Sequence, residues 1–162
     1  MSAFDRKRRQ LFHITRKSDV SPLRPPWALD ELLFQDACTR CGDCLTSCPE
    51  GILQRESVNG YPVVNFTVGE CTFCKQCVEV CPTKALNLSQ TPVWPAKAVV
   101  KSTCLALQGV ICTTCAEQCE AEAISFTASL GKVSEPMINI NACTACGACV
   151  APCPTQAIEV RQ

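Results

Sequence analysis

Short apolar runs, separated by turn residues at close intervals, extend along the whole chain, and none approaches the 18 residues of a membrane-spanning helix. One pair of runs, at residues 52–55 and 61–66, flanks the dipeptide Asn59-Gly60. Asn-Gly between two strand-like segments is a strong hairpin signal, because both residues tolerate positive φ. The pattern therefore predicts a short antiparallel hairpin over residues 52–66.

The C-terminal half repeats this plan. Residues 123–127 and 137–140 are strand-like and flank a turn at Gly131. Two further apolar runs, at residues 85–88 and 157–160, predict one closing strand for each half. The chain therefore has the elements of two similar small units.

The segment between the two halves differs from the hairpin segments. Residues 91–95 include two prolines and predict a linker. Trp94 lies in this linker, and Trp27 also stands beside proline. We expect both tryptophans to pack as apolar lids on the fold, with a docking role as the alternative, because tryptophan is enriched at binding hot spots.

Composition changes the picture, because cysteine supplies 16 of the 162 residues. At about one residue in ten, cysteine chemistry sets the architecture of a chain. Aromatic residues make up only 6%, which leaves little material for a conventional core. These numbers point to a disulfide-stapled secreted protein or to a metal protein.

The sixteen cysteines form four groups of four, separated by 22, 22 and 23 residues. Groups one, two and four share the spacing C-x2-C-x2-C-x3-C-P. Group three has seven residues, 105–111, in place of the first two, and Glu120 in place of the proline. The groups are Cys38, Cys41, Cys44 and Cys48; Cys71, Cys74, Cys77 and Cys81; Cys104, Cys112, Cys115 and Cys119; and Cys143, Cys146, Cys149 and Cys153.

This spacing is typical of bacterial two-cluster ferredoxins. Three cysteines on one tight loop offer three thiolates to one iron–sulfur cubane, and the fourth ligates the neighbouring cluster. Zinc sites favour separated CxxC pairs, often with histidine, whereas His13 is the only histidine and lies outside every group. The pattern therefore predicts four [4Fe-4S] clusters in preference to zinc or disulfides.

Groups one and two enclose one predicted hairpin, and groups three and four enclose the other, so we pair them in that order. A nested pairing of one with four and two with three is left open. The same sixteen cysteines act as ligands in either arrangement. The predicted ligand sets are Cys38, Cys41, Cys44 and Cys81 (first set); Cys71, Cys74, Cys77 and Cys48 (second set); Cys104, Cys112, Cys115 and Cys153 (third set); and Cys143, Cys146, Cys149 and Cys119 (fourth set).

The predicted fold class is α+β, with two tandem 2[4Fe-4S] ferredoxin-like units built from short hairpins and short helices. Units of about 55 to 65 residues often need a metal to fold, so the clusters replace a missing core. The predicted boundaries are an arm at 1–34, a first unit at 35–90, a linker at 91–101 and a second unit at 102–162.

Charge is unevenly distributed, although the formal net charge is zero. Residues 1–24 carry seven basic and two acidic side chains, and residues 25–162 carry eight basic and thirteen acidic ones. Arg8-Arg9 resembles a twin-arginine export signal, but the apolar region that such a signal needs does not follow. We therefore predict a cytoplasmic protein whose partly disordered basic arm docks on a partner, with a merely solubilising tail as the alternative.

The long segment of group three has two interpretations. The first interpretation is a surface loop that the fold tolerates and that has no role of its own. The other is a loop that tunes the cluster, because apolar surroundings disfavour added negative charge and lower the potential. Backbone N–H groups of the loop would oppose that shift by bonding sulfur, and the sequence does not decide between the two effects.

Motifs for other chemistry are missing from the sequence. It has no nucleotide-binding glycine motif and no nucleophile set with a base, since every cysteine belongs to a group. We expect neither an enzyme nor a nucleic-acid-binding protein. A contact with a membrane surface is left open.

Several segments carry a family resemblance: Arg8-Arg9, Arg24-Pro25-Pro26-Trp27, Cys38-Thr39-Arg40-Cys41, residues 52–55, residues 60–66 and the long third group with Cys119-Glu120. In these segments the chain resembles the NapF family of ferredoxin-type proteins, which is associated with periplasmic nitrate reductase. The resemblance implies a cytoplasmic protein that binds the catalytic subunit of that enzyme before export and assists its maturation at its iron–sulfur centre. A polyferredoxin-type electron carrier, or an electron-transfer subunit of an anaerobic respiratory oxidoreductase, is the alternative.

Overall fold

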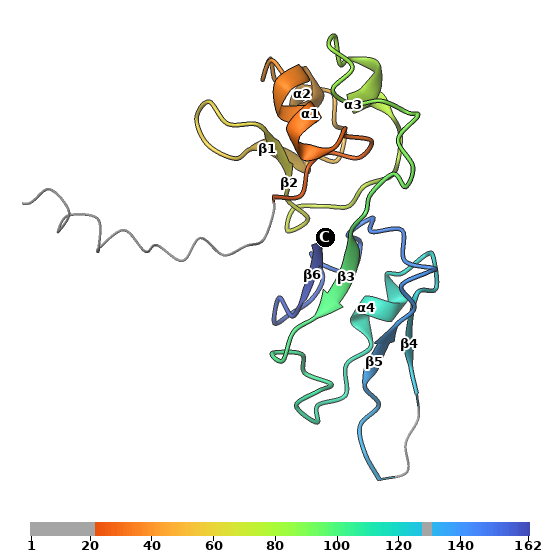
Figure 1. The fold of residues 1–162 in the computed structure, drawn as a ribbon. Helices are drawn as coiled ribbons and strands as arrows, with labels where there is room; N and C mark the ends of the chain where they lie inside the picture. Colours follow the sequence, from red (N-terminus) through yellow and green to blue (C-terminus); the bar gives the residue numbers. More distant parts are fainter. Residues whose placement is uncertain (1–21, 128–130) are drawn as a thin grey trace, which may run out of the picture.

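The computed structural model of the chain describes residues 22–127 and 131–162. These residues form short helices and three two-stranded sheets, with the two units one above the other in Figure 1. Along the described ranges, no helix has the length and apolar character to cross a membrane. The elements are α1 (Glu31–Ala37), α2 (Asp43–Thr46), β1 (Leu53–Arg55), β2 (Pro62–Val64), α3 (Gln76–Glu79), β3 (Lys97–Val100), α4 (Thr114–Glu117), β4 (Ile124–Phe126), β5 (Pro136–Ile138) and β6 (Ile158–Arg161).

Both predicted hairpins are confirmed. β1 pairs with β2 in antiparallel register, with Leu53 opposite Val64. β4 pairs with β5, with Ile124 opposite Ile138. The paired strands are three residues long and thus shorter than the apolar runs that predicted them. Each hairpin holds the two cysteine groups of its unit together.

The closing strands differ from the prediction. β6 forms as expected, but its antiparallel partner is β3, whose residues 97–100 fall inside the predicted linker. In the first unit, a single bridge between Leu86 and Ala28 takes the place of the strand predicted at 85–88. The run ends early because the Asn87 side chain accepts the backbone N–H of Ser89 at 3.0 Å, which starts a turn.

Part of the predicted N-terminal arm belongs to the first unit. The N–H of Trp27 donates to the Val93 carbonyl at 3.0 Å, and the N–H of Leu29 donates to the Ala85 carbonyl at 3.0 Å. α1 follows and buries Phe34 completely. Residues 22–34 are therefore packed against the cysteine-bearing segments, while the prediction for residues 1–21 lies outside the described residues.

Arg24 fixes this segment in place. Its side chain is only 6% exposed and forms two hydrogen bonds with Glu31, at 2.7 and 2.9 Å. It also donates to Glu56 and to the Pro62 carbonyl, both at 3.3 Å. A bidentate guanidinium–carboxylate pair compensates the desolvation of a buried charge. The arginine therefore ties the segment before α1 to the first hairpin.

The two tryptophans pack inside the fold, as predicted. Trp27 and Trp94 are 6% and 5% exposed, and each has its ring edge-on to Phe73, at 6.2 and 6.1 Å between centroids. The indole N–H of Trp94 donates to the Arg24 carbonyl at 2.8 Å, so its polar atom is satisfied. Phe66 extends this aromatic cluster, with its centroid 5.6 Å from that of Trp94.

Candidate metal centres

All sixteen cysteines lie in the described part of the chain, and all are free thiols. They line four separate cavities, one for each predicted set. Each cavity is lined by four cysteines, three from one group and the last from the other group of the same unit. Every set predicted from the sequence thus surrounds one cavity, and the pairing of the groups is one with two and three with four.

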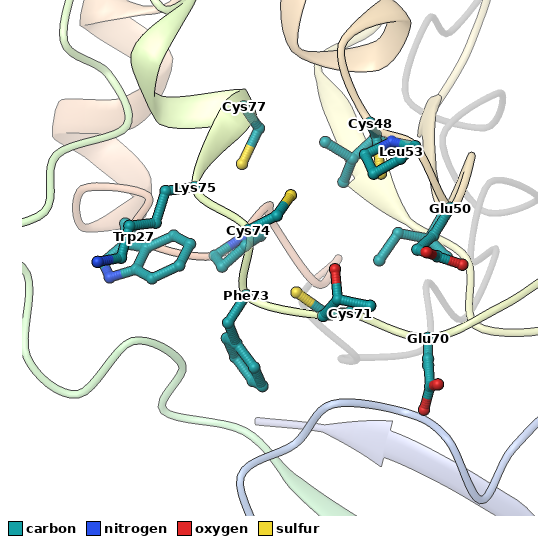
Figure 2. A pocket seen from close by; sticks show the side chains of 14 residues that line it. Trp27, Cys48, Glu50, Leu53, Glu70, Cys71, Phe73, Cys74, Lys75 and Cys77 are labelled. Carbon is teal, nitrogen blue, oxygen red and sulfur yellow. The ribbon is translucent and has the colours of Figure 1, made fainter.

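Figure 2 shows the cavity of the second set. Cys71, Cys74 and Cys77 come from the loop before α3 and from its first turn, and Cys48 enters from the other group. The walls are otherwise largely apolar and include Trp27, Leu53 and Phe73. In the described residues, no three side chains of the metal-binding types are close enough to hold a single ion. The thiols instead surround a space, a geometry that fits a cluster of several atoms.

A recurring backbone turn aims the fourth cysteine of each group. The residue three positions later always has positive φ, and its N–H donates to the carbonyl of that cysteine at 2.9 to 3.4 Å. Three of these residues have a side chain, for which this conformation costs energy. The turn residues are Gly51 (φ 62°), Lys84 (φ 58°), Glu122 (φ 47°) and Gln156 (φ 50°).

The turn also presents backbone N–H groups to sulfur. The N–H of Ala123 donates to the Cys119 sulfur at 3.3 Å, and the N–H of Ala157 donates to the Cys153 sulfur at 3.2 Å. Hydrogen bonds of this kind stabilise negative charge on the ligand. These N–H groups therefore hold the two sulfurs and place positive partial charge beside them.

Left-handed residues recur in the loops of the first three cysteines as well. They occupy two positions in groups one, two and four: between the first two cysteines, and directly after the second one. Such residues turn successive N–H groups to one side and create a concavity suited to anions, iron–sulfur clusters included. The pairs are Arg40 and Gly42, Phe73 and Lys75, and Ala145 and Gly147.

Group three is built differently. Thr113, the residue after its second cysteine, has φ −125° and is not left-handed. The long segment before it folds on itself, because the N–H groups of Gln108 and Val110 donate to the carbonyl of Leu105 at 3.0 and 2.9 Å. Leu105 lines the cavity of the third set, whereas Ile111 is 84% exposed. The segment is therefore a compact surface loop that lends one apolar side chain to the cavity.

Burial makes these thiols reluctant to ionise without a metal. Desolvation, followed by the charges of the neighbouring cysteines, raises the pKa of Cys44, Cys77 and Cys149 to about 12. The same burial raises the pKa of Cys71 and Cys115 to about 11. Metal ligation must therefore supply the free energy that keeps the sulfurs anionic.

Cys153 is the contrasting case. Desolvation raises its pKa, but hydrogen bonds from the backbone N–H groups of Ala157 and Thr155 and from the Thr155 hydroxyl outweigh that effect and leave it lowered. At Cys81, Cys112 and Cys153, a threonine two residues later places its hydroxyl 3.7 to 3.9 Å from the sulfur. The repeated triplet Cys-Pro-Thr at 81–83 and 153–155 is the sequence signal for a threonine hydroxyl beside a cysteine sulfur.

Two cations beside the cysteine loops were missed by the sequence reasoning. Arg55 donates to the carbonyls of Arg40 and Cys41 at 2.9 and 3.3 Å. Lys97 donates to the carbonyl of Cys143 at 2.6 Å. Both brace a cysteine loop from a strand far away in the sequence, so no local pattern marks them.

Comparison with known proteins agrees with this geometry. The family model for a 4Fe-4S dicluster domain matches residues 37–86 and 110–158. The ferredoxin-type protein NapF of Escherichia coli K12 is 40% identical over 136 residues, which cover 84% of this chain and 82% of that protein. NapF of Haemophilus influenzae is 41% identical over 145 residues, covering 90% and 82%. The methylamine utilization ferredoxin-type protein MauM of Methylobacillus flagellatus is 35% identical over 156 residues, covering 86% and 67%. With two dicluster matches and relatives of this identity along most of its length, the chain belongs to the NapF family of ferredoxin-type iron–sulfur proteins.

Proposed function

We propose that each of the four cavities holds one [4Fe-4S] cluster, ligated by the set of four cysteines around it. The observation that supports this count is the fourfold recurrence of one arrangement: four thiols, three from one group and one from its partner group, around one cavity. Iron–sulfur clusters of this type take up and release one electron at a time. The residues of the chain supply thiolates, N–H groups toward sulfur and apolar walls that limit the access of water.

We further propose that the chain is a cytoplasmic accessory protein. It binds the precursor of the catalytic subunit of periplasmic nitrate reductase and assists the maturation of that subunit, most directly at its iron–sulfur centre. Identity to NapF proteins over 84–90% of the chain is the observation that carries this proposal.

An electron-transfer role is the second candidate. Similarity to MauM, a ferredoxin-type protein named for methylamine utilization, supports it, since one scaffold then occurs in two metabolic systems. In this role the chain accepts electrons from one redox partner and gives them to another. No assembly step on a client protein is then needed.

The first experiment counts iron in protein that is purified without oxygen. Sixteen thiolates at four per cubane require about 16 iron and about 16 acid-labile sulfide per chain. Eight of each would reduce the count to two clusters. Zinc without sulfide would refute the iron–sulfur assignment altogether.

The second experiment separates the two roles. The full chain and a variant without residues 2–21 are used to capture the nitrate reductase precursor from cytosol at several salt concentrations. Specific capture that weakens with salt and with truncation supports the accessory role and a docking arm. Fast reduction by a defined donor protein without any capture would favour the electron carrier, and recovery of the full chain from the periplasm would overturn the proposed location.

A further inference from the structure

Two cysteine loops from different units meet in this structure. The N–H of Cys71, in the loop of group two, donates to the carbonyl of Cys146, in the loop of group four, with an N···O distance of 2.8 Å. Cys71 lines the cavity of the second set, and Cys146 lines that of the fourth. The backbone atoms of two neighbouring cavities are therefore in direct contact.

Side chains reinforce this contact. Gly147, directly after Cys146, has φ +85°, and a Cβ placed on it would overlap the ring of Phe66. Phe66 is 6% exposed and packs edge-on against Trp94 of the first unit. Only a glycine lets the loop of group four approach this ring so closely.

The residues around the contact are part of both cores. Ala145 belongs by sequence to the second unit, yet it is 2% exposed and packs within the core of the first unit. Val150 and Val160 pack against the cores of both units. The junction is a packed interface and not a single hydrogen bond.

Within a unit, the two cavities are already linked because they exchange ligands. Each cysteine group supplies three thiols to one cavity of the unit and its fourth thiol to the other cavity. The first cavity thus adjoins the second, and the third adjoins the fourth. The contact between Cys71 and Cys146 adds the link between the second and the fourth.

From these links we propose that the four clusters stand in one line, in the order first, second, fourth, third, and that Gly147 and Phe66 are the positioning residues of its central step. The chain is then one continuous redox path whose terminal clusters are the first and the third, and not two independent ferredoxins on a linker. Each electron that leaves one cluster of the line is gained by the next, with an external one-electron donor protein at one end and an acceptor protein at the other. This inference rests on the proposed function, specifically on four clusters per chain.

The test uses the full holoprotein and the variant Gly147→Ala, whose new methyl group displaces the loop of group four from Phe66. Iron content is measured first, because Gly147 lies in the cysteine loop of the fourth set, and exchange and spectra are compared at full iron content. We expect the amide of Cys71 to exchange with deuterium at least ~tenfold faster, because its acceptor moves away. In dithionite-reduced protein, the magnetic interaction between the clusters of the two units should weaken in the electron paramagnetic resonance spectrum.

Two further variants control for strain and folding. Gly131→Ala places the same methyl group on a glycine with φ +75° that has no atom within 4 Å of the new Cβ, so backbone strain is matched without the overlap. It should leave the Cys71 exchange and the spin interaction unchanged. Adding Phe66→Ala to Gly147→Ala removes the overlap and should restore part of the interaction. If Gly147→Ala loses iron, Phe66→Leu replaces it, and it should speed Cys71 exchange by a smaller factor with full iron content.

Native-like exchange and spectra in Gly147→Ala and in Phe66→Leu, at full iron content, would overturn the inference. Equal effects from Gly131→Ala would do the same. Iron content below about 16 per wild-type chain contradicts the proposed function instead, so the two failures are distinguishable.

Discussion

The two units carry the same arrangement of cysteines on very different supports. The core of the first unit contains ten buried residues, among them Phe34, Ile52, Phe66 and Trp94, and one of the ten, Ala145, comes from the second unit. The second unit has a core of five, and two of these are the cysteines Cys115 and Cys149. The first unit also has the buried Arg24 ion pair and α1, elements without a counterpart among the described residues of the second unit.

This difference shows how the same metal site can be supported in two ways. Where apolar side chains are buried in number, each stabilises the fold by about 1.5–3 kcal/mol. Where they are few, metal ligation must supply that stability, because binding free energy and folding free energy are then the same quantity. We conclude that the second unit depends on its clusters more than the first unit does.

Removal of iron is the strongest test of this comparison. Anaerobic chelation should abolish the hydrogen-exchange protection of β4 and β5 completely, a loss of the whole stability of that unit. β1 and β2 should keep residual protection for longer, since the aromatic core remains beside them. Exchange measured by mass spectrometry at successive times after chelation checks the order, and simultaneous loss in both hairpins would show that the units are equally dependent.

The crossed fourth cysteines give the next largest effect. Cys48→Ala and Cys119→Ala should each remove about a quarter of the iron, because each deletes one ligand of one cluster. Cys119→Ala should lower the melting temperature more than Cys48→Ala, since its unit has the smaller core.

Iron analysis and anaerobic calorimetry measure both effects. Spectroscopy then shows which cluster is lost: Cys48→Ala should spare the cluster of the first set and damage that of the second set. Damage to the cluster beside Cys38, Cys41 and Cys44 would contradict the exchange of ligands between groups.

Sequence reasoning reaches furthest where the determinants are local. The cysteine sets follow from spacings of three and four residues, and the first hairpin follows from a turn dipeptide between two apolar runs. These features need no knowledge of distant segments, which explains why all four predicted sets surround cavities.

The features that were missed depend on distant contacts. β3 is a strand because β6, about sixty residues later, pairs with it. Arg24 is buried because Glu56 and the Pro62 carbonyl meet it, 32 and 38 residues away. A proline-rich linker and a basic arm were reasonable interpretations of the local sequence, and tertiary pairing overrides them for residues 97–100 and 22–34.

Trp94→Ala tests the aromatic support of the first unit. Loss of a buried tryptophan costs about 3–5 kcal/mol, and it also leaves the Arg24 carbonyl without its indole donor. Anaerobic denaturant titration should show this loss for the first unit. Trp94→Phe keeps most of the packing and should cost clearly less, so equal losses would mean that the hydrogen bond and not the ring carries the effect.

The smallest effect concerns the potential of the third cluster. Groups one, two and four each place two left-handed residues in their cysteine loop, whereas Thr113 in group three has φ −125° and is not left-handed. The N–H groups of Gln108, Gly109 and Val110 bond to carbonyls of their own loop and are not offered to sulfur. Fewer N–H donors near sulfur stabilise the reduced, more negative state less. This loop should therefore lower the potential of the third cluster, against the opposite effect of the Ala157 N–H, which bonds to the Cys153 sulfur of the same set.

Replacing residues 105–111 with Thr-Ala, the pair between Cys143 and Cys146, should raise that potential by roughly 20–60 mV. One hydrogen bond of about 0.5–1.5 kcal/mol corresponds to this shift in a one-electron couple. Redox titration followed by electron paramagnetic resonance measures it. Ile111→Ser is the matched control, because this side chain is 84% exposed on the same loop and should leave the potential unchanged. If the serine variant shifts the potential as far as the shortened loop does, apolar surface and not the lost N–H donors sets the third cluster apart.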